Sequence, residues 1–196
     1  MSCNTLNINK SLFAAAVGAA VLIIIGNVEM NHYLDKEGTG YNKVGLVMLL
    51  LGWVILSILV STSKQTGKFD HSLFLKKGLP ALVVFAAAIV SHKLMEQGGG
   101  MKMVGASGLY LAAWVLFASM LVHVDTSSSS TSQKKEKGLL IYGGMALINV
   151  SMLALNVNRK YNGLTGKWDG PENVFGMGLP LLMLGWVSVC MGIAYC

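Results

Sequence analysis

Charged residues are scarce in this chain: only 12% of its 196 residues are Asp, Glu, Lys or Arg, whereas 54% are hydrophobic. About a quarter of the residues of a typical soluble domain are charged, so the composition excludes an ordinary soluble fold. The apolar residues instead form blocks long enough to cross a bilayer, which takes roughly 17 to 25 residues each. We therefore predict a single transmembrane domain, residues 1–196, in which spans and short loops leave no room for a soluble domain.

Cysteines and catalytic motifs are also scarce. Cys3, Cys190 and Cys196 are too few and too widely spaced for a disulfide framework or a CxxC metal site. We interpret them as free thiols, although Cys3 and Cys196 also suit palmitoylation. The sequence has no Gly-x-Ser-x-Gly, Walker loop or His-Glu-x-x-His motif. These absences favour a protein that is not an enzyme and has no cofactor.

Metal and retinal sites are not predicted either. His32 and His92 are the only histidines expected to form a pair at one membrane face, and catalytic zinc usually needs three protein ligands. No span carries a central lysine for a retinal Schiff base. The net charge of +6 comes from lysines spread over short loops rather than from a basic stripe with aromatics, so we expect contact with lipid head groups and no nucleic acid.

The apolar blocks predict an all-α protein with six transmembrane helices, because lipid offers no hydrogen-bond partner to open backbone and the blocks lack the alternation of barrel strands. The first block has no small-x-small cleavage site after it, so we interpret it as a retained helix and not a signal peptide. The Ser- and Lys-rich segment 125–137 is expected to be a disordered connector. The predicted spans are about 11–30, 44–61, 79–94, 103–124, 138–157 and 174–196.

One segment recurs within the chain. Gly45–Val54 returns as Gly178–Val187 with seven of ten positions identical, and Trp114-Val115 forms a weaker echo between them. Each copy closes a pair of spans. Similar apolar segments often arise by chance. The shared upstream glycine and the Gly-Trp-Val match nevertheless favour an approximate threefold repeat of a helical hairpin. The hairpin units are about 10–61, 77–124 and 137–196 and would be related by an axis along the membrane normal.

The tryptophans of the repeat lie near the middle of their spans, where an interfacial aromatic belt does not explain them. A pore-lining or ligand-stacking ring is one hypothesis. We favour helix packing, with large rings filling the space beside small residues. The predicted packing residues are Gly45, Gly52, Trp53, Trp114, Gly178, Gly185 and Trp186.

Ionisable side chains are missing from the centres of the spans, where they would mark an ion path. Asn149 and Ser151 are the most central polar residues. They are candidates for a polar path, although hydrogen bonds between helices explain them as well.

The lysine distribution and the absence of catalytic groups predict the membrane orientation and the general class of function. The side that holds both termini carries eight lysines and the opposite side seven cationic residues, and we place both termini in the cytosol. The absence of catalytic groups favours a multi-pass integral membrane protein with a structural or assembly role, as an accessory subunit of a larger membrane complex or as a virion membrane component. Its expected partners are the lipid bilayer and other membrane subunits or further copies of the chain. The alternative is a small channel or transporter.

Overall fold

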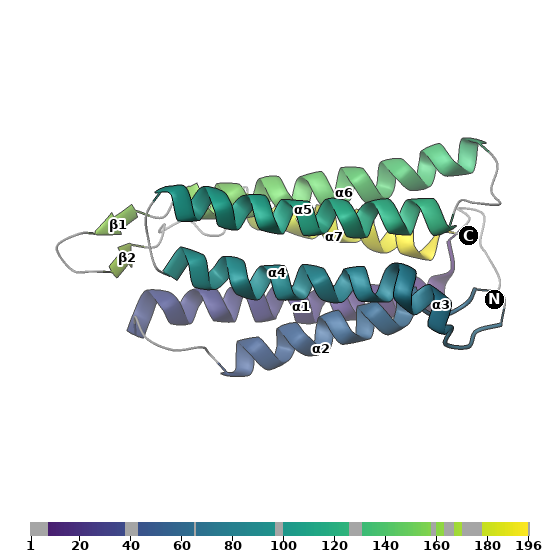
Figure 1. Cartoon of the computed structure of the whole chain (residues 1–196), viewed down its shortest axis with the longest axis horizontal. Coiled ribbons are helices and arrows are strands. Elements are labelled where there is room, and N and C mark those ends of the chain that lie inside the picture. The colour runs from purple at the N-terminus through teal and green to yellow at the C-terminus, as the bar shows by residue number, and fades with distance from the viewer. Residues whose placement is uncertain are drawn as a thin grey trace.

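The computed structural model describes residues 8–37, 43–64, 66–96, 100–125, 131–157, 160–162, 167–169 and 178–195, and at several helix ends it describes only the backbone. The described residues form an elongated bundle of long helices that run side by side (Figure 1). The long helices are α1 (Lys10–Glu37), α2 (Lys43–Val60), α4 (Leu79–Glu96), α5 (Gly100–Asp125), α6 (Thr131–Val157) and α7 (Gly178–Ala194).

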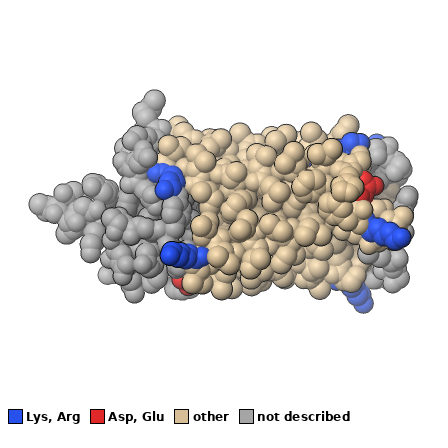
Figure 2. Space-filling model, turned by 60° about the horizontal axis from the view of Figure 1, so that its bottom comes forward, with Lys and Arg blue, Asp and Glu red and all other residues tan. Residues whose placement is uncertain are grey.

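Four helical stretches among the described residues are long and apolar enough to cross a membrane, namely Lys10–Asn27, Lys43–Val60, His71–Ser91, which begins before α4 and continues into it, and Val104–Val124. Helix α7 is also apolar but has 17 residues, or about 26 Å at about 1.5 Å per residue. Large apolar side chains are exposed on all six long helices, including Leu139 at 75% and Val104 at 71%. On the face drawn in Figure 2, the described charged residues lie at the two ends. The chain is therefore helical with a membrane-like apolar surface.

The long helices close into a ring. Each helix packs against the helix that follows it, in the order α1, α2, α4, α5, α6, α7, and α7 packs back against α1. The closest packing is within three sequence-adjacent helix pairs, α1 with α2, α4 with α5 and α6 with α7. Buried apolar side chains from all six helices form one core cluster. The centre of the ring is therefore filled with side chains.

Both described chain ends lie at the same end of the bundle, which we call the terminus end. Ile8 forms an antiparallel bridge with Tyr195, and the backbone N–H of Asn9 donates to the carbonyl of Ala194 at 2.9 Å. The Lys64 ammonium donates to the Tyr195 carbonyl, and the Tyr195 hydroxyl donates to Glu136. These contacts join the start of α1, the loop after α2, the start of α6 and the end of α7.

The helix that contains α4 begins earlier than the span predicted from residue 79. A short helix α3 (His71–Leu73) and a π-helical turn η1 (Phe74–Gly78) lead into α4 without a break. The Asp70 carboxylate caps this helix by accepting from the backbone N–H groups of Ser72 at 2.7 Å and Leu73 at 3.1 Å. Such a side-chain acceptor satisfies backbone donors that have no partner within the helix, and it accounts for the early start.

The expected connector 125–137 differs from the structure over its second half. Helix α6 begins at Thr131, so residues 131–137 are helical, while 126–130 lie outside the described residues. Gln, Lys and Glu are good helix formers, and the Ser132 hydroxyl donates to the Glu136 carboxylate one turn later at 3.2 Å. The polar segment that suggested disorder forms the largely exposed first turns of a long helix.

A small strand pair interrupts the helical architecture. The backbone of β1 (Lys160–Asn162) pairs antiparallel with β2 (Lys167–Asp169), with Tyr161 opposite Trp168. Both strands lie beyond α6, at the end of the bundle opposite the termini (Figure 1). The sequence analysis assigned no strand to these residues, which lie between the predicted spans 138–157 and 174–196.

Candidate functional site

The three tryptophans of the repeated segment meet at the centre of the bundle. The ring centroids of Trp53 and Trp114 are 5.6 Å apart, those of Trp53 and Trp186 are 5.8 Å apart, and those of Trp114 and Trp186 are 5.4 Å apart. All three contacts are edge to face, the arrangement that aromatic rings prefer. The rings are 0%, 1% and 3% exposed in the order Trp53, Trp114, Trp186. We call these residues the tryptophan triad.

Two further aromatic residues extend the triad, and the sequence analysis missed both. Phe117 packs against Trp53 and Trp114 with centroid distances of 6.2 Å and 5.9 Å, and Tyr110 packs edge-on against Trp114 at 6.4 Å. Their spacing gave a usable signal, because residues three or four positions from Trp114 share its helix face. The aromatic core is thus larger on α5 than on α2 or α7.

Glycines next to the triad bring the helices of a pair close together. A Cβ atom built on Gly52 would lie 2.8 Å from the carbonyl oxygen of Ala19 on α1. A Cβ atom on Gly185 would lie 2.8 Å from the carbonyl oxygen of Gly144 on α6. Both positions exclude a side chain, as expected where helix backbones touch. The adjacent tryptophans therefore project from helices that are held by close backbone contact.

The buried positions recur at the same spacing on the three helices that carry tryptophan. Counted from each tryptophan, the same seven positions are buried on α2, α5 and α7. On α2 they are Gly45, Leu49, Gly52, Trp53, Leu56, Ser57 and Val60. On α5 they are Ala106, Tyr110, Ala113, Trp114, Phe117, Ala118 and Leu121. On α7 they are Gly178, Leu182, Gly185, Trp186, Val189, Cys190 and Ile193.

The indole N–H groups of Trp53 and Trp114 are buried and have no hydrogen-bond partner among the described residues. A buried donor left without a partner costs about 1–3 kcal/mol. The edge-to-face contacts bring each ring against the π face of a neighbour, and an N–H···π contact recovers only part of that cost. The triad therefore places two hydrogen-bond donors without a described acceptor inside an apolar core.

Asn149 and Ser151 lie on α6, with exposures of 9% and 0%. The Asn149 side-chain amide donates to the carbonyl of Met145 at 2.9 Å, and the Ser151 hydroxyl donates to the carbonyl of Ile148 at 2.8 Å. Both acceptors belong to α6 itself. These hydrogen bonds satisfy the two side chains within their own helix, in the way that Ser and Asn commonly do when they lie mid-helix.

Three serines donate hydrogen bonds from one helix to another. The Ser91 hydroxyl on α4 donates to the carbonyl of Ala106 on α5 at 2.8 Å, and that of Ser188 on α7 donates to Leu140 on α6 at 2.7 Å. The Ser57 hydroxyl on α2 donates to the carbonyl of Gly78 at 2.9 Å and thereby joins the first helix pair to the second.

Histidine pairing is not tested by the geometry, because the side chains of His32 and His92 lie outside the described residues. Among the side chains that are described, no three His, Cys, Asp or Glu residues lie close enough to hold a metal ion. Cys190 is a buried free thiol on α7, and Cys3 and Cys196 are not described.

The site that the geometry defines is thus an aromatic, glycine-flanked core at the centre of a helical ring. Comparison with known proteins adds no identity to it: the chain matches no family model, no curated protein and no solved structure.

Proposed function

We propose that the chain is a multi-pass integral membrane protein with a structural or assembly role, as an accessory subunit of a larger membrane complex or as a virion membrane component. The observation that carries the proposal is the tryptophan triad, which fills the centre of the ring with three nearly fully buried rings. A transport path would need room and polar groups at this level. A solid core leaves the outer surface as the part of the molecule that meets partners.

We further propose six membrane spans in three hairpins, α1–α2, α4–α5 and α6–α7, that descend from one repeated unit. The seven equivalent buried positions on α2, α5 and α7 support the repeat. The first helices of the hairpins, α1, α4 and α6, support the repeat too, because three equivalent positions are buried on each of them. These positions are Ala16, Ala19 and Gly26 on α1, Ala81, Val84 and Ser91 on α4, and Ile141, Gly144 and Ser151 on α6. In this arrangement α6 and α7 cross the bilayer beside the four apolar helices, with which they share the ring.

The apolar flank supports partners within the membrane. Every long helix exposes large apolar side chains, so the flank surrounds the molecule and is not confined to one patch. Lipid covers such a surface, and other membrane subunits or a second copy pack on it through close side-chain contacts.

The proposal is tested by mild solubilisation of native membranes followed by affinity capture of the tagged full chain and mass spectrometry. We expect the same membrane proteins, or a second copy of the chain, to be captured at a fixed ratio. The control is capture after a brief exposure to a harsh detergent, which should release the partners while the chain stays folded. A chain that is captured alone from native membranes and migrates as a monomer would contradict the assembly role.

A small channel or transporter is the second candidate, and one observation favours it. The buried indole N–H groups of Trp53 and Trp114 offer hydrogen-bond donors at the centre of the ring, where a permeating solute would have to pass. Asn149, the candidate for a polar path on α6, is 9% exposed. Solute flux in liposomes that disappears in Asn149→Leu would support this candidate.

A further inference from the structure

Residues 61–70 connect α2 to the helix that continues into α4, and we call them the interfacial loop. They lie at the terminus end of the bundle, where Lys64 donates to the Tyr195 carbonyl. The apolar stretch before the loop ends at Val60, and the apolar stretch after it begins at His71. In the membrane-spanning arrangement proposed above, the interfacial loop therefore lies at the level where hydrocarbon gives way to lipid head groups.

Backbone hydrogen bonds fix the shape of the interfacial loop. Thr62 and Phe69 form an antiparallel bridge, and the N–H of Asp70 donates to the carbonyl of Ser61 at 3.0 Å. The turn between the paired residues contains Gly67, whose φ of 67° is one that glycine adopts without strain. The loop therefore holds the Phe69 side chain at a defined place just beyond α2.

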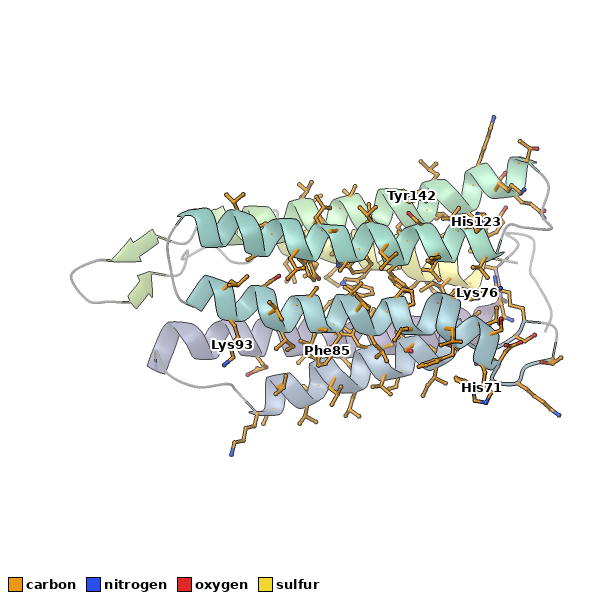
Figure 3. The ribbon with its side chains drawn as sticks, in the orientation of Figure 1. His71, Lys76, Phe85, Lys93, His123 and Tyr142 are labelled. Carbon is orange, nitrogen blue, oxygen red and sulfur yellow. The ribbon has the colours of Figure 1, made fainter. Side chains whose placement is uncertain are left out.

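An aromatic cluster of Phe69, His71 and Phe74 lies where the loop meets the following helix. The Phe69 ring contacts the His71 ring edge to face at a centroid distance of 5.3 Å and the Phe74 ring at 5.7 Å. Figure 3 shows His71 at the terminus end of the bundle. Phe69 is 45% exposed, and Leu75, the neighbour of Phe74, is 65% exposed. Ordered apolar side chains that stay in water forgo the free energy of burial, so this surface suits a less polar surrounding.

The exposed apolar surface continues from the cluster along the outer face of the helix. Leu75, Leu79 and Val83 follow one another at four-residue spacing and are 65%, 45% and 39% exposed. All three belong to the apolar stretch His71–Ser91, whose outer face meets lipid in the proposed arrangement. The aromatic cluster is thus the head-group end of a lipid-facing stripe.

The charges around the cluster favour an anionic surface. Lys68 and Lys76 flank the cluster in the sequence and are exposed. The segment 61–78 contains four lysines and one carboxylate, that of Asp70, which accepts from backbone N–H groups at the helix start. Interfacial segments combine lysines with phenylalanine and leucine in this way, and basic residues at this level are attracted to anionic lipid.

We propose that Phe69, Phe74 and Leu75 insert among the lipid head groups at the terminus end of the bundle, and that Lys68 and Lys76 bind anionic phosphates there. We call these five residues the interfacial anchor. The proposal rests on the membrane-spanning arrangement proposed above, and it adds a lipid-binding surface that needs no protein partner. An anchor built into the connection between α2 and α4 fixes how deeply the first two helix pairs sit in the bilayer.

The test is the depth of a nitroxide spin label attached to Phe69→Cys in the full chain, reconstituted in vesicles of phosphatidylcholine and phosphatidylglycerol. Cys3→Ser and Cys196→Ser remove competing thiols, and Cys190 is buried. Oxygen, which concentrates in lipid, should relax the label at position 69 more than a water-soluble nickel chelate does. The matched control is Thr66→Cys, an exposed position of the same loop, where the nickel chelate should relax the label more than oxygen does.

The lipid charge is tested with spin-labelled phosphatidylglycerol and phosphatidylcholine, which broaden the spectrum of the label at position 69 when they lie beside it. Phosphatidylglycerol should be preferred. Lys68→Gln and Lys76→Gln should each lower this preference about fivefold, the contribution of one lysine near an anionic surface. The matched control, Lys134→Gln with Lys135→Gln, removes two exposed lysines of α6 and should change the preference at position 69 less than about twofold.

Other outcomes overturn the proposal. Equal access of the nickel chelate to positions 66 and 69 would place Phe69 in water, and equal preference for the two lipids would remove the anionic phosphate. A label at position 69 that is shielded from both reagents would show that protein, such as a second copy of the chain, covers the anchor. Should the Phe69→Cys variant fail to fold, as judged by circular dichroism, Leu75→Cys replaces it, with the same accessibility expected.

A label at Val83→Cys separates this proposal from the spanning arrangement. If oxygen relaxes the label at position 83 while the label at position 69 lies in water, the anchor alone is overturned. If the label at position 83 also lies in water, the spanning arrangement is overturned and the anchor with it.

Discussion

Gly144 and Gly185 face each other across α6 and α7 so closely that a Cβ atom on Gly144 would lie 2.6 Å from the carbonyl oxygen of Gly185. Backbone cannot yield as a flexible side chain can, so a larger residue at either position has to separate the helices. We expect Gly185→Ala and Gly144→Ala each to lower the stability in detergent by about 1–3 kcal/mol through overpacking. Thermal unfolding followed by circular dichroism measures the loss.

Gly143 gives the matched control, because a Cβ atom at this position would meet nothing within 4 Å. Gly143→Ala should leave stability unchanged or raise it by up to about 1 kcal/mol through the better helix propensity of alanine. Equal destabilisation by Gly143→Ala and Gly144→Ala would show that the glycines act through helix propensity and not through close packing.

The tryptophan triad makes a second prediction. Trp53→Ala removes a fully buried ring and should cost about 3–5 kcal/mol. Trp53→Phe keeps most of the aromatic contact and removes an indole N–H that has no partner among the described residues, so it should change stability by less than about 1 kcal/mol. Thermal unfolding compares the two variants. A loss as large for phenylalanine as for alanine would mean that the N–H group is bound to an acceptor in the membrane-embedded protein.

The serine hydroxyls between helices should contribute little individually. Ser57→Ala, Ser91→Ala and Ser188→Ala should each cost about 0.6 kcal/mol, the typical value for hydrogen bonds between transmembrane helices. Thr62→Val is the control, because the Thr62 hydroxyl donates to Ile58 of its own helix turn at an exposed position. Chemical unfolding in mixed micelles resolves such small differences, and a loss above about 2 kcal/mol for any one serine would contradict the estimate.

Tyr195 makes a prediction about closure of the ring. Its backbone pairs with Ile8 and accepts from Lys64, and its hydroxyl donates to Glu136. Tyr195→Phe should cost about 1 kcal/mol for the lost hydrogen bond and should speed hydrogen exchange at Asn9, whose N–H is bound to Ala194. Exchange at helix residues near the triad should stay unchanged. Unaltered exchange at Asn9 would show that the Tyr195 hydroxyl does not hold the chain ends together.

The sequence was informative where one physical requirement dominated. Long apolar runs demand helices in lipid, and the four membrane-length helices followed from that requirement. The central position of Trp53, Trp114 and Trp186 indicated packing inside the bundle, and the three rings do meet there. The contact among the three rings joins residues far apart in the sequence, and neither hydrophobic periodicity nor composition specifies such a contact.

Other features depend on geometry that a single sequence does not encode visibly. The polar first turns of α6 resemble a linker by composition, although Gln, Lys and Glu are good helix formers and the Ser132 hydroxyl bonds to Glu136 within the helix. The π-helical turn at Phe74–Gly78 leads into α4, and within this turn Lys77 is buried whereas Lys76 is exposed. The roles of Phe117 and Tyr110 emerge only once three helices converge on one centre.

The most direct test of a closed core is solute flux through liposomes that contain the purified chain. Since the triad fills the centre of the ring, we predict that proteoliposomes leak protons, potassium, chloride and small neutral solutes no faster than protein-free liposomes. Flux well above that background in the wild type, reduced to background by Asn149→Leu, would contradict the account and establish a transport path.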